Sequence, residues 1–305
     1  MNPQGILDQI RAFFKKNNMF TNLIWVNVIV FVIILLIGVT ATLMRLENLV
    51  DLKTGEYLFL EPTISTTADM GGFIRRPWSI ITYMFTHQSF GHIFGNMLMF
   101  YFFGQYLFRF LGSRKLLSTY LLGGIAGWVA YVLGYNFLPA LQGVYSYMIG
   151  ASASVMACVI AAATYSPNLK INLIFIQVEF KYLAALWVIT DIYSLGQLEN
   201  AGGYMAHLGG ALYGFLMIKQ LQKGKDINAW FERLVDIISN LWKRNPKMKV
   251  VYKRPEAANL SDEEYNYTQA QAQQKVDAIL DKIAHGGYGS LTKSEKAFLN
   301  KYSAK

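Results

Sequence analysis

The stretch Ile149-Gly150-Ala151-Ser152-Ala153-Ser154-Val155-Met156-Ala157 opens one of the most apolar segments of the chain and carries a hydroxyl near its start. Ser152 stands between small residues, so its side chain is sterically open to an approaching backbone. A second apolar segment begins with Ala206-His207-Leu208-Gly209-Gly210-Ala211-Leu212-Tyr213-Gly214. A serine at the start of one such segment and a histidine at the start of another could form a nucleophile and its general base, which makes Ser152 and His207 the first candidate pair.

The composition is that of a membrane protein. Of the 305 residues, 53% are hydrophobic and only 15% are charged, unlike an ordinary soluble domain. The net charge is +9, and from Lys219 onward 16 Lys and Arg residues stand against 10 Asp and Glu residues. No nucleic-acid-binding motif accompanies this charge, so we expect a membrane surface and no nucleic acid as its partner.

Six apolar segments predict six transmembrane helices and hence an all-α membrane protein. Their ranges are 23–44, 91–110, 116–138, 150–165, 182–198 and 203–222. The fourth is short for a bilayer core of about 30 Å. Its Ser152 end is therefore predicted to begin below the bilayer surface, in protein or in a water-filled cavity.

Basic and non-basic loops alternate along these segments, which predicts that both termini lie in the cytoplasm. The same alternation places Ser152 and His207 near one side of the bilayer, the non-cytoplasmic side. We expect a multi-pass protein of a bacterial inner (plasma) membrane.

The domain organisation follows from charge and periodicity. Residues 1–22 form a cytoplasmic amphipathic lead, 23–222 form the six-span core with a non-cytoplasmic first loop at 45–90, 223–260 form an interfacial amphipathic helix with a basic linker, and 261–305 form a small helical cytoplasmic tail. The stretch from Lys243 to Arg254 has six basic residues and no acid, so anionic lipid headgroups are its expected partner.

His92 and Asn96 are four residues apart and share one helical face. Acyl transfer needs hydrogen-bond donors for an oxyanion, and these two side chains with the backbone N–H of Ser152 could supply them. Each residue also has a structural interpretation, because a serine can cap a helix, a histidine can pack on glycine and an asparagine can bond a neighbouring helix.

The motifs Gly150-x-Ser152, His207-x-x-Gly210-x-x-x-Gly214 and His87-x-x-x-x-His92-x-x-x-Asn96 together resemble those of the rhomboid intramembrane serine proteases. The resemblance implies a bundle of six transmembrane helices around a water-filled cavity, with a Ser/His dyad and no acidic third member.

By that resemblance Ser152 is the nucleophile, His207 is its base, and His92 and Asn96 belong to the oxyanion hole. Gly150, Gly210 and Gly214 support helix packing, the last two by letting the sixth helix press against the fourth.

The implied function is an intramembrane serine endopeptidase that cleaves transmembrane segments of membrane proteins near the non-cytoplasmic face, with no cofactor and no metal. The sequence departs from the family pattern at Ala153, where glycine is usual, at Met156, where tyrosine is usual, and at Trp78-Ser79, where the family has Trp-Arg.

Three other functions fit part of the pattern. A noncatalytic rhomboid-like protein that binds membrane proteins would share the fold. A transporter would account for Asp191 inside the fifth apolar segment. A metalloprotease could use His87, His92 and His207, although no His-Glu-x-x-His motif is present.

Overall fold

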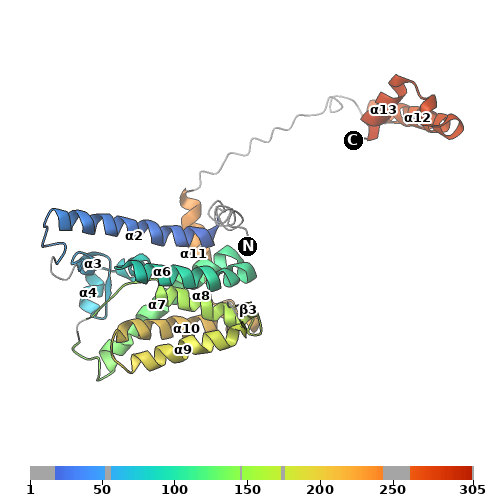
Figure 1. Cartoon of the computed structure of the whole chain (residues 1–305). Helices are drawn as coiled ribbons and strands as arrows, with labels where there is room; N and C mark the ends of the chain where they lie inside the picture. The colour runs from blue at the N-terminus through green and yellow to red at the C-terminus, as the bar shows by residue number, and fades with distance from the viewer. Residues whose placement is uncertain (1–17, 52–55, 145, 173–175, 243–261, 304–305) are drawn as a thin grey trace. The chain divides into compact units, whose positions relative to one another are not determined.

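A computed structural model describes residues 18–51, 56–144, 146–172, 176–242 and 262–303 (Figure 1). The chain divides into two compact units, Met1–Lys243 and Arg244–Lys305, both helical. In chain order the elements of the first unit are α2 (Met19–Leu43), α3 (Leu60–Thr63), β1 (Thr66–Thr67), α4 (Met70–Arg75), α5 (Ser79–Thr82), a 3₁₀ turn (Tyr83–Phe85), α6 (Phe90–Met99), a π-helical stretch (Phe100–Gly104), α7 (Gln105–Phe137), β2 (Tyr147–Met148), α8 (Ser152–Tyr165), β3 (Lys170–Asn172), β4 (Gln177–Glu179), α9 (Phe180–Leu195), α10 (Ala201–Gln222) and α11 (Ala229–Trp242).

Helix α2 begins at a capping box formed by Asn18 and Thr21. The Asn18 side chain accepts a hydrogen bond from the Thr21 backbone N–H at 3.0 Å, which satisfies a donor that the first helical turn leaves free. The helix is uncharged over its length and exposes large apolar side chains such as Ile29 and Leu36. Such an all-round apolar helix is suited to a lipid environment rather than to water.

A long helical run covers Phe90–Phe137 and is interrupted by a kink at Gly112. Gly112 has φ +79°, which glycine adopts without a steric cost, and its backbone is not helical. The break falls between the predicted spans 91–110 and 116–138. Among the described residues, α2 and this run are the two helices whose length and hydropathy qualify them as candidate membrane spans, and α8 is a shorter apolar helix. The structure thus confirms a mostly helical fold, while six crossings remain a prediction.

Helix α8 is the centre of the core. Its side chains from Ala153 to Ala163 are all buried, and α6, α7, α9 and α10 pack around it. Small residues make this possible: a Cβ at Gly123 on α7 would collide with the side chain of Ala157. Close approach of this kind between small residues is how helices associate in membranes.

The first loop is folded and contacts the start of α8. Strand β1 pairs antiparallel with β2, with Thr66 opposite Met148 and Thr67 opposite Tyr147. Because β2 lies just before Ser152 in the chain, this pairing fixes the segment that leads into α8. A second hairpin, β3–β4, connects α8 to α9.

Polar contacts join α11 and the residue before it to the N-terminal half of α7. Lys115 Nζ lies 2.7 Å from Glu232 Oε1, and Asn228, fully buried, donates to Ser118 Oγ at 2.8 Å. The other face of α11 exposes Trp230 and Ile237. This is the pattern of an interfacial amphipathic helix.

The second unit is a pair of helices, α12 (Asp262–Gly286) and α13 (Lys293–Ser303), joined through a short 3₁₀ turn. Buried Val276, Ile279 and Leu291 form its small core. Both helices fall within 261–305, the segment for which the sequence predicts a small helical tail. The predicted lead at 1–22, apart from its last residues, and the basic stretch from Lys243 to Arg254 lie outside the described residues.

Candidate active site

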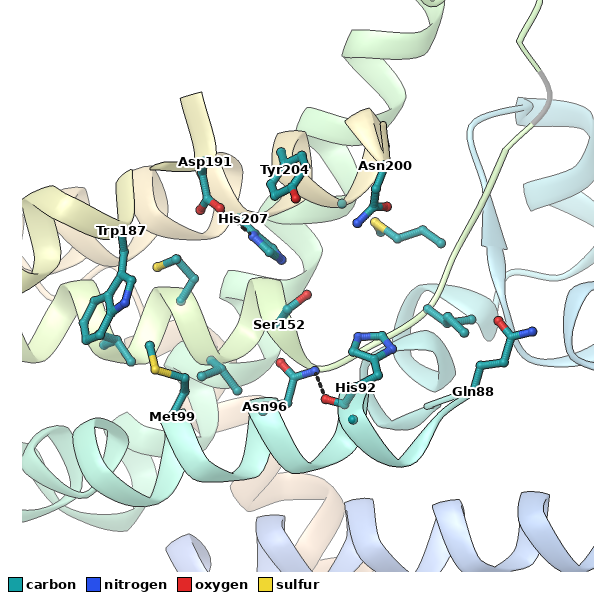
Figure 2. A pocket seen from close by; sticks show the side chains of 18 of the residues that line it. Gln88, His92, Asn96, Met99, Ser152, Trp187, Asp191, Asn200, Tyr204 and His207 are labelled. Carbon is teal, nitrogen blue, oxygen red and sulfur yellow. Dashed lines mark hydrogen bonds and ion pairs between the residues drawn. The ribbon is translucent and has the colours of Figure 1, made fainter. Parts of the chain in front are cut away.

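A cavity of about 720 Å³ lies where α6, α8 and α10 begin and α9 approaches its end (Figure 2). The four polar side chains singled out in the sequence all line it: Ser152, His207, His92 and Asn96. Figure 2 shows Ser152 between the side chains of His207 on one side and Asn96 and His92 on the other. Three helix starts therefore bring together residues that are far apart in the chain.

Ser152 is the first residue of α8 and is half-buried. The residue before Ala151, Gly150, has φ +118°, a conformation that favours glycine, and its N–H donates to the carbonyl oxygen of Tyr83 at 2.9 Å. This turn redirects the chain from β2 into α8. As the first helical residue, Ser152 also has a backbone N–H without a partner inside the helix.

Ser154 has a different environment, although it is only two residues away. Its hydroxyl is buried against α7, where a Cβ at Gly124 would lie 2.5 Å from Ser154 Oγ, and it does not line the cavity. Ser152 is therefore the serine of this motif that a cavity-bound molecule could reach.

His207 lies in the second turn of α10. Gly210, one turn later, faces α8 so closely that a Cβ there would collide with the carbonyl oxygen of Ala153, and Gly214 has the same relation to Ala157. The edge of the Tyr204 ring packs against the His207 ring, with centroids 5.9 Å apart and an interplanar angle of 88°.

His92 and Asn96 project from α6 into the cavity. A Cβ at Gly150 would lie 2.6 Å from His92 Nε2, so the ring packs directly on the glycine backbone. Asn96 Nδ2 donates to the carbonyl oxygen of His92 at 2.9 Å. A side-chain amide has two N–H donors, so one stays available for a molecule in the cavity.

His87 is fully buried, just before α6, and does not line the cavity. Its Nε2 accepts a hydrogen bond from the Ala151 N–H at 3.4 Å, and its ring meets that of His92 edge-on. Burial, and then the neighbouring His92, lower the pKa of His87 to about 3. A neutral His87 thus supports the turn that precedes Ser152.

Asp191 is the site residue whose place the sequence did not predict. Asp191 Oδ1 lies 3.1 Å from His207 Nδ1, and both side chains are largely buried. An acid inside an apolar segment requires a partner, which is a usable signal. The sequence alone does not show which of several polar residues provides it, because Asp191 and His207 lie on different helices.

Two of the three places at which this sequence departs from the family pattern are also at the site. Ala153 is buried between α7 and α10, and Met156 lines the cavity. Within the part of the chain that the structure describes, no group of three His, Cys, Asp or Glu side chains could hold a metal ion. The geometry therefore gives no support to a metal site built from His87, His92 and His207.

Two segments of the chain match known families. Residues 75–223 match the family described as the Rhomboid domain, and residues 261–305 match a family of unknown function, DUF6576. The first segment contains the whole cavity; the second contains α12 and α13.

Curated relatives match the same region. The chain is 30% identical over 158 residues to RHOMBOID-like protein 12, mitochondrial, of Arabidopsis thaliana, which is 48% of this chain and 47% of that protein. It is 31% identical over 139 residues to the presenilin-associated rhomboid-like protein, mitochondrial, of Mus musculus (44% and 35%), and 32% identical over 158 residues to Rhomboid protein 1, mitochondrial, of Saccharomyces cerevisiae (48% and 43%). The chain covers less than half the length of each of these relatives.

These relatives correct one prediction. The sequence led us to expect a bacterial inner membrane, and this expectation is contradicted, because the relatives are named as mitochondrial proteins. Loop charges report the side of a membrane and not which membrane it is, so they could not distinguish the two. The family match and the relatives that share this region show that residues 75–223 form a Rhomboid domain.

Proposed function

We propose that this protein is an intramembrane serine endopeptidase that cleaves transmembrane segments of other membrane proteins inside the cavity. The observation that carries the proposal is the position of Ser152 and His207, which come from the starts of two helices and line one cavity. A nucleophile, a base and several N–H donors around one space are what acyl transfer requires.

The membrane topology belongs to the same proposal. We take α2, the two halves of the run interrupted at Gly112, α8, α9 and α10 as six crossings, in agreement with the alternating loop charges. The helix starts that form the cavity then share one side of the membrane. The basic loops and α11 lie on the other side, where the stretch from Lys243 to Arg254 would meet anionic headgroups.

The substrate would be an unwound part of a transmembrane segment. A peptide bond within a helix is shielded by the helix's own turns, so a segment must become extended before Ser152 can reach its carbonyl carbon. We propose that it enters beside α9, which contributes Trp187 and Asp191 to the cavity wall.

In the first step Ser152 Oγ forms a bond to the carbonyl carbon while His207 takes the hydroxyl proton. The carbonyl oxygen becomes an oxyanion, for which Asn96, His92 and the Ser152 backbone N–H are the proposed donors. The C–N bond then breaks, and the proton on His207 passes to the leaving amine. The product of this step is an ester between Ser152 and the N-terminal part of the substrate.

In the second step a water molecule attacks the ester carbon and gives a proton to His207. The C–Oγ bond breaks, Ser152 recovers its proton from His207, and the fragment leaves as a carboxylic acid. The cavity volume of about 720 Å³ leaves room for water beside an extended peptide.

The test compares two serines of one helix. Ser152→Ala should lower cleavage of a purified single-span reporter substrate by about 10³-fold or more, and should abolish labelling by a fluorophosphonate probe. Ser154→Ala, which removes a buried hydroxyl outside the cavity, should leave labelling intact.

If the wild-type protein neither cleaves nor labels but still captures the reporter, the chain is a noncatalytic rhomboid-like binder. Labelling and cleavage that survive Ser152→Ala would reject Ser152 as the nucleophile.

A further inference from the structure

The contact between His207 and Asp191 has a specific chemical consequence. Nδ1 of the imidazole and Oδ1 of the carboxylate are 3.1 Å apart, within hydrogen-bond distance. An ionised carboxylate can only accept hydrogen bonds, so the proton of the neutral ring must be on Nδ1. The lone pair is then on Nε2, the ring nitrogen that is not held by Asp191.

Asp191 is placed to balance a positive charge. Among the described residues that line the cavity, Asp191 is the only one with a carboxylate, and none of them is lysine or arginine. Its side chain is 11% exposed, and its second oxygen, Oδ2, is buried with no hydrogen-bond partner among those residues. A buried carboxylate without a permanent cation is costly, and a protonated His207 would compensate it.

We propose that Asp191 is a positioning residue that completes a Ser152–His207–Asp191 triad in this protein, holding the His207 ring with Nε2 available and stabilising the imidazolium that forms during acyl transfer. The inference rests on the proposed function. It differs from the resemblance, which implies a dyad with no acidic third member.

The packing around the ring leaves this role to Asp191. Within the described part of the chain, the ionisable groups that face His207 are Asp191 from α9, His92 from α6 and Tyr204 from its own helix. Helix α8 contributes the Ser152 hydroxyl. Tyr204 meets the ring through an edge-on contact and not through a hydrogen bond to Nδ1. Neither histidine nor tyrosine can replace a carboxylate as a fixed anion at neutral pH.

If Asp191 positions His207, its loss should lower the catalytic rate and leave substrate binding nearly unchanged. In Asp191→Asn the charge is lost and the ring is free to adopt the other tautomer, so kcat should fall by about 10²- to 10⁴-fold with little change in KM. The fluorophosphonate labelling rate should fall by a similar factor. The neighbouring Thr190→Val is the matched control, because Thr190 is exposed on the same helix and its hydroxyl donates to the Trp187 carbonyl oxygen of that helix.

Two further readouts separate positioning from simple helix packing. Removing the anion beside the imidazole should move the acidic limb of the pH–rate profile in Asp191→Asn, which a loss of helix packing alone would not do. The chain has four histidines, so ¹⁵N-histidine labelling in detergent micelles should reveal a downfield Nδ1–H proton for His207 that disappears in this variant.

The outcomes are distinguishable from failure of the proposed function. If the wild type cleaves and labels, but Asp191→Asn matches it in kcat and pH profile, the triad is rejected and the protease remains. If the wild type does neither, the proposed function fails first. Should Asp191→Asn not fold, Asp191→Glu should retain part of the rate, and absence of the downfield proton in the wild type would overturn the proposal.

Discussion

Gly210 on α10 and Ala153 on α8 are so close that a Cβ at position 210 would collide with the Ala153 carbonyl oxygen. Ala153 directly follows Ser152, and His207 precedes Gly210 by one helical turn. The contact therefore sets the distance between the two helices that carry the proposed nucleophile and base. The Gly210 backbone faces the Ala153 backbone directly, so no flexible side chain lies between the two helices that could move aside.

Gly210→Ala should destabilise the protein and slow the reaction together. The added methyl forces α10 away from α8, for which overpacking costs about 1–3 kcal/mol, and it moves His207 away from Ser152. Thermal unfolding in detergent and the fluorophosphonate labelling rate measure the two effects.

Gly95→Ala is the control for the stability effect alone, because Gly95 lines the cavity. A Cβ at Gly95, within α6, has no neighbouring atom within 4 Å. Alanine is there expected to stabilise the helix by about 0.5–1 kcal/mol. Equal destabilisation by the two variants would show that the contact with Ala153 does not limit the helix spacing.

Gly150→Ala should impair catalysis through His92. Two effects coincide at this position: φ is +118°, and a Cβ would lie 2.6 Å from His92 Nε2. Displacing the ring should remove a proposed oxyanion donor, and loss of one such donor lowers kcat by about 10²- to 10³-fold. Steady-state cleavage of the reporter substrate measures this.

Gly143→Ala separates backbone strain from the collision. Gly143 also has positive φ, +75°, but a Cβ there has open space around it. It should cost about 1–2 kcal/mol of stability with kcat unchanged. If both variants lose kcat to the same extent, strain in the loop and not the position of His92 explains the defect.

The sequence predicted the polar set of the site because its members stand out from apolar surroundings. Ser152, His207, His92 and Asn96 were each identified by chemistry and spacing, and the structure brings all of them to one cavity. Their catalytic roles remain predictions. The contact of Asp191 with His207 could not be predicted, since pairing between helices depends on their rotation and depth, which no local pattern records.

Helix positions were predictable for a similar reason, and their ends were not. Long apolar runs place α2 and α10 close to the predicted segments 23–44 and 203–222. The ends depend on single contacts such as the Asn18 capping box, which starts α2 earlier than hydropathy indicates. The break at Gly112 falls in the predicted gap between the segments 91–110 and 116–138, where glycine beside basic residues is typical of a turn.

Glu232→Gln should loosen α11 from the core. Glu232 Oε1 lies 2.7 Å from Lys115 Nζ and accepts from Ser118 Oγ at 2.9 Å, with both charged side chains mostly buried. Losing this charge weakens hydrogen bonds worth about 1.5–3 kcal/mol to a charged group. Faster amide hydrogen exchange in α11 should report it.

Asp236→Asn, on the same helix, is the matched comparison. Its partner Arg114 is 72% exposed, and exposed ion pairs contribute about 0–1 kcal/mol. Exchange in α11 should therefore stay close to that of the wild type. If both variants accelerate exchange to a similar extent, the contact of Glu232 with Lys115 does not hold α11 more strongly than the exposed ion pair does.

The pairing of α12 with α13 should weaken in acid because of Glu295. Its carboxylate accepts from Lys282 Nζ at 2.8 Å and from the Thr292 N–H at 2.7 Å, and these contacts lower its pKa from 4.5 to about 2. A lowered pKa in the folded state means that the stabilisation is complete above pH 4.5 and is lost as the pH falls from 4.5 towards 2. Amide exchange of α13 in the full chain should accelerate over that window.

Glu295→Gln should already exchange faster at neutral pH and show a smaller acid-induced change. Glu263→Gln, at the exposed start of α12, should behave as the wild type does. An unchanged acid response in Glu295→Gln would assign the pH dependence to other carboxylates of this unit.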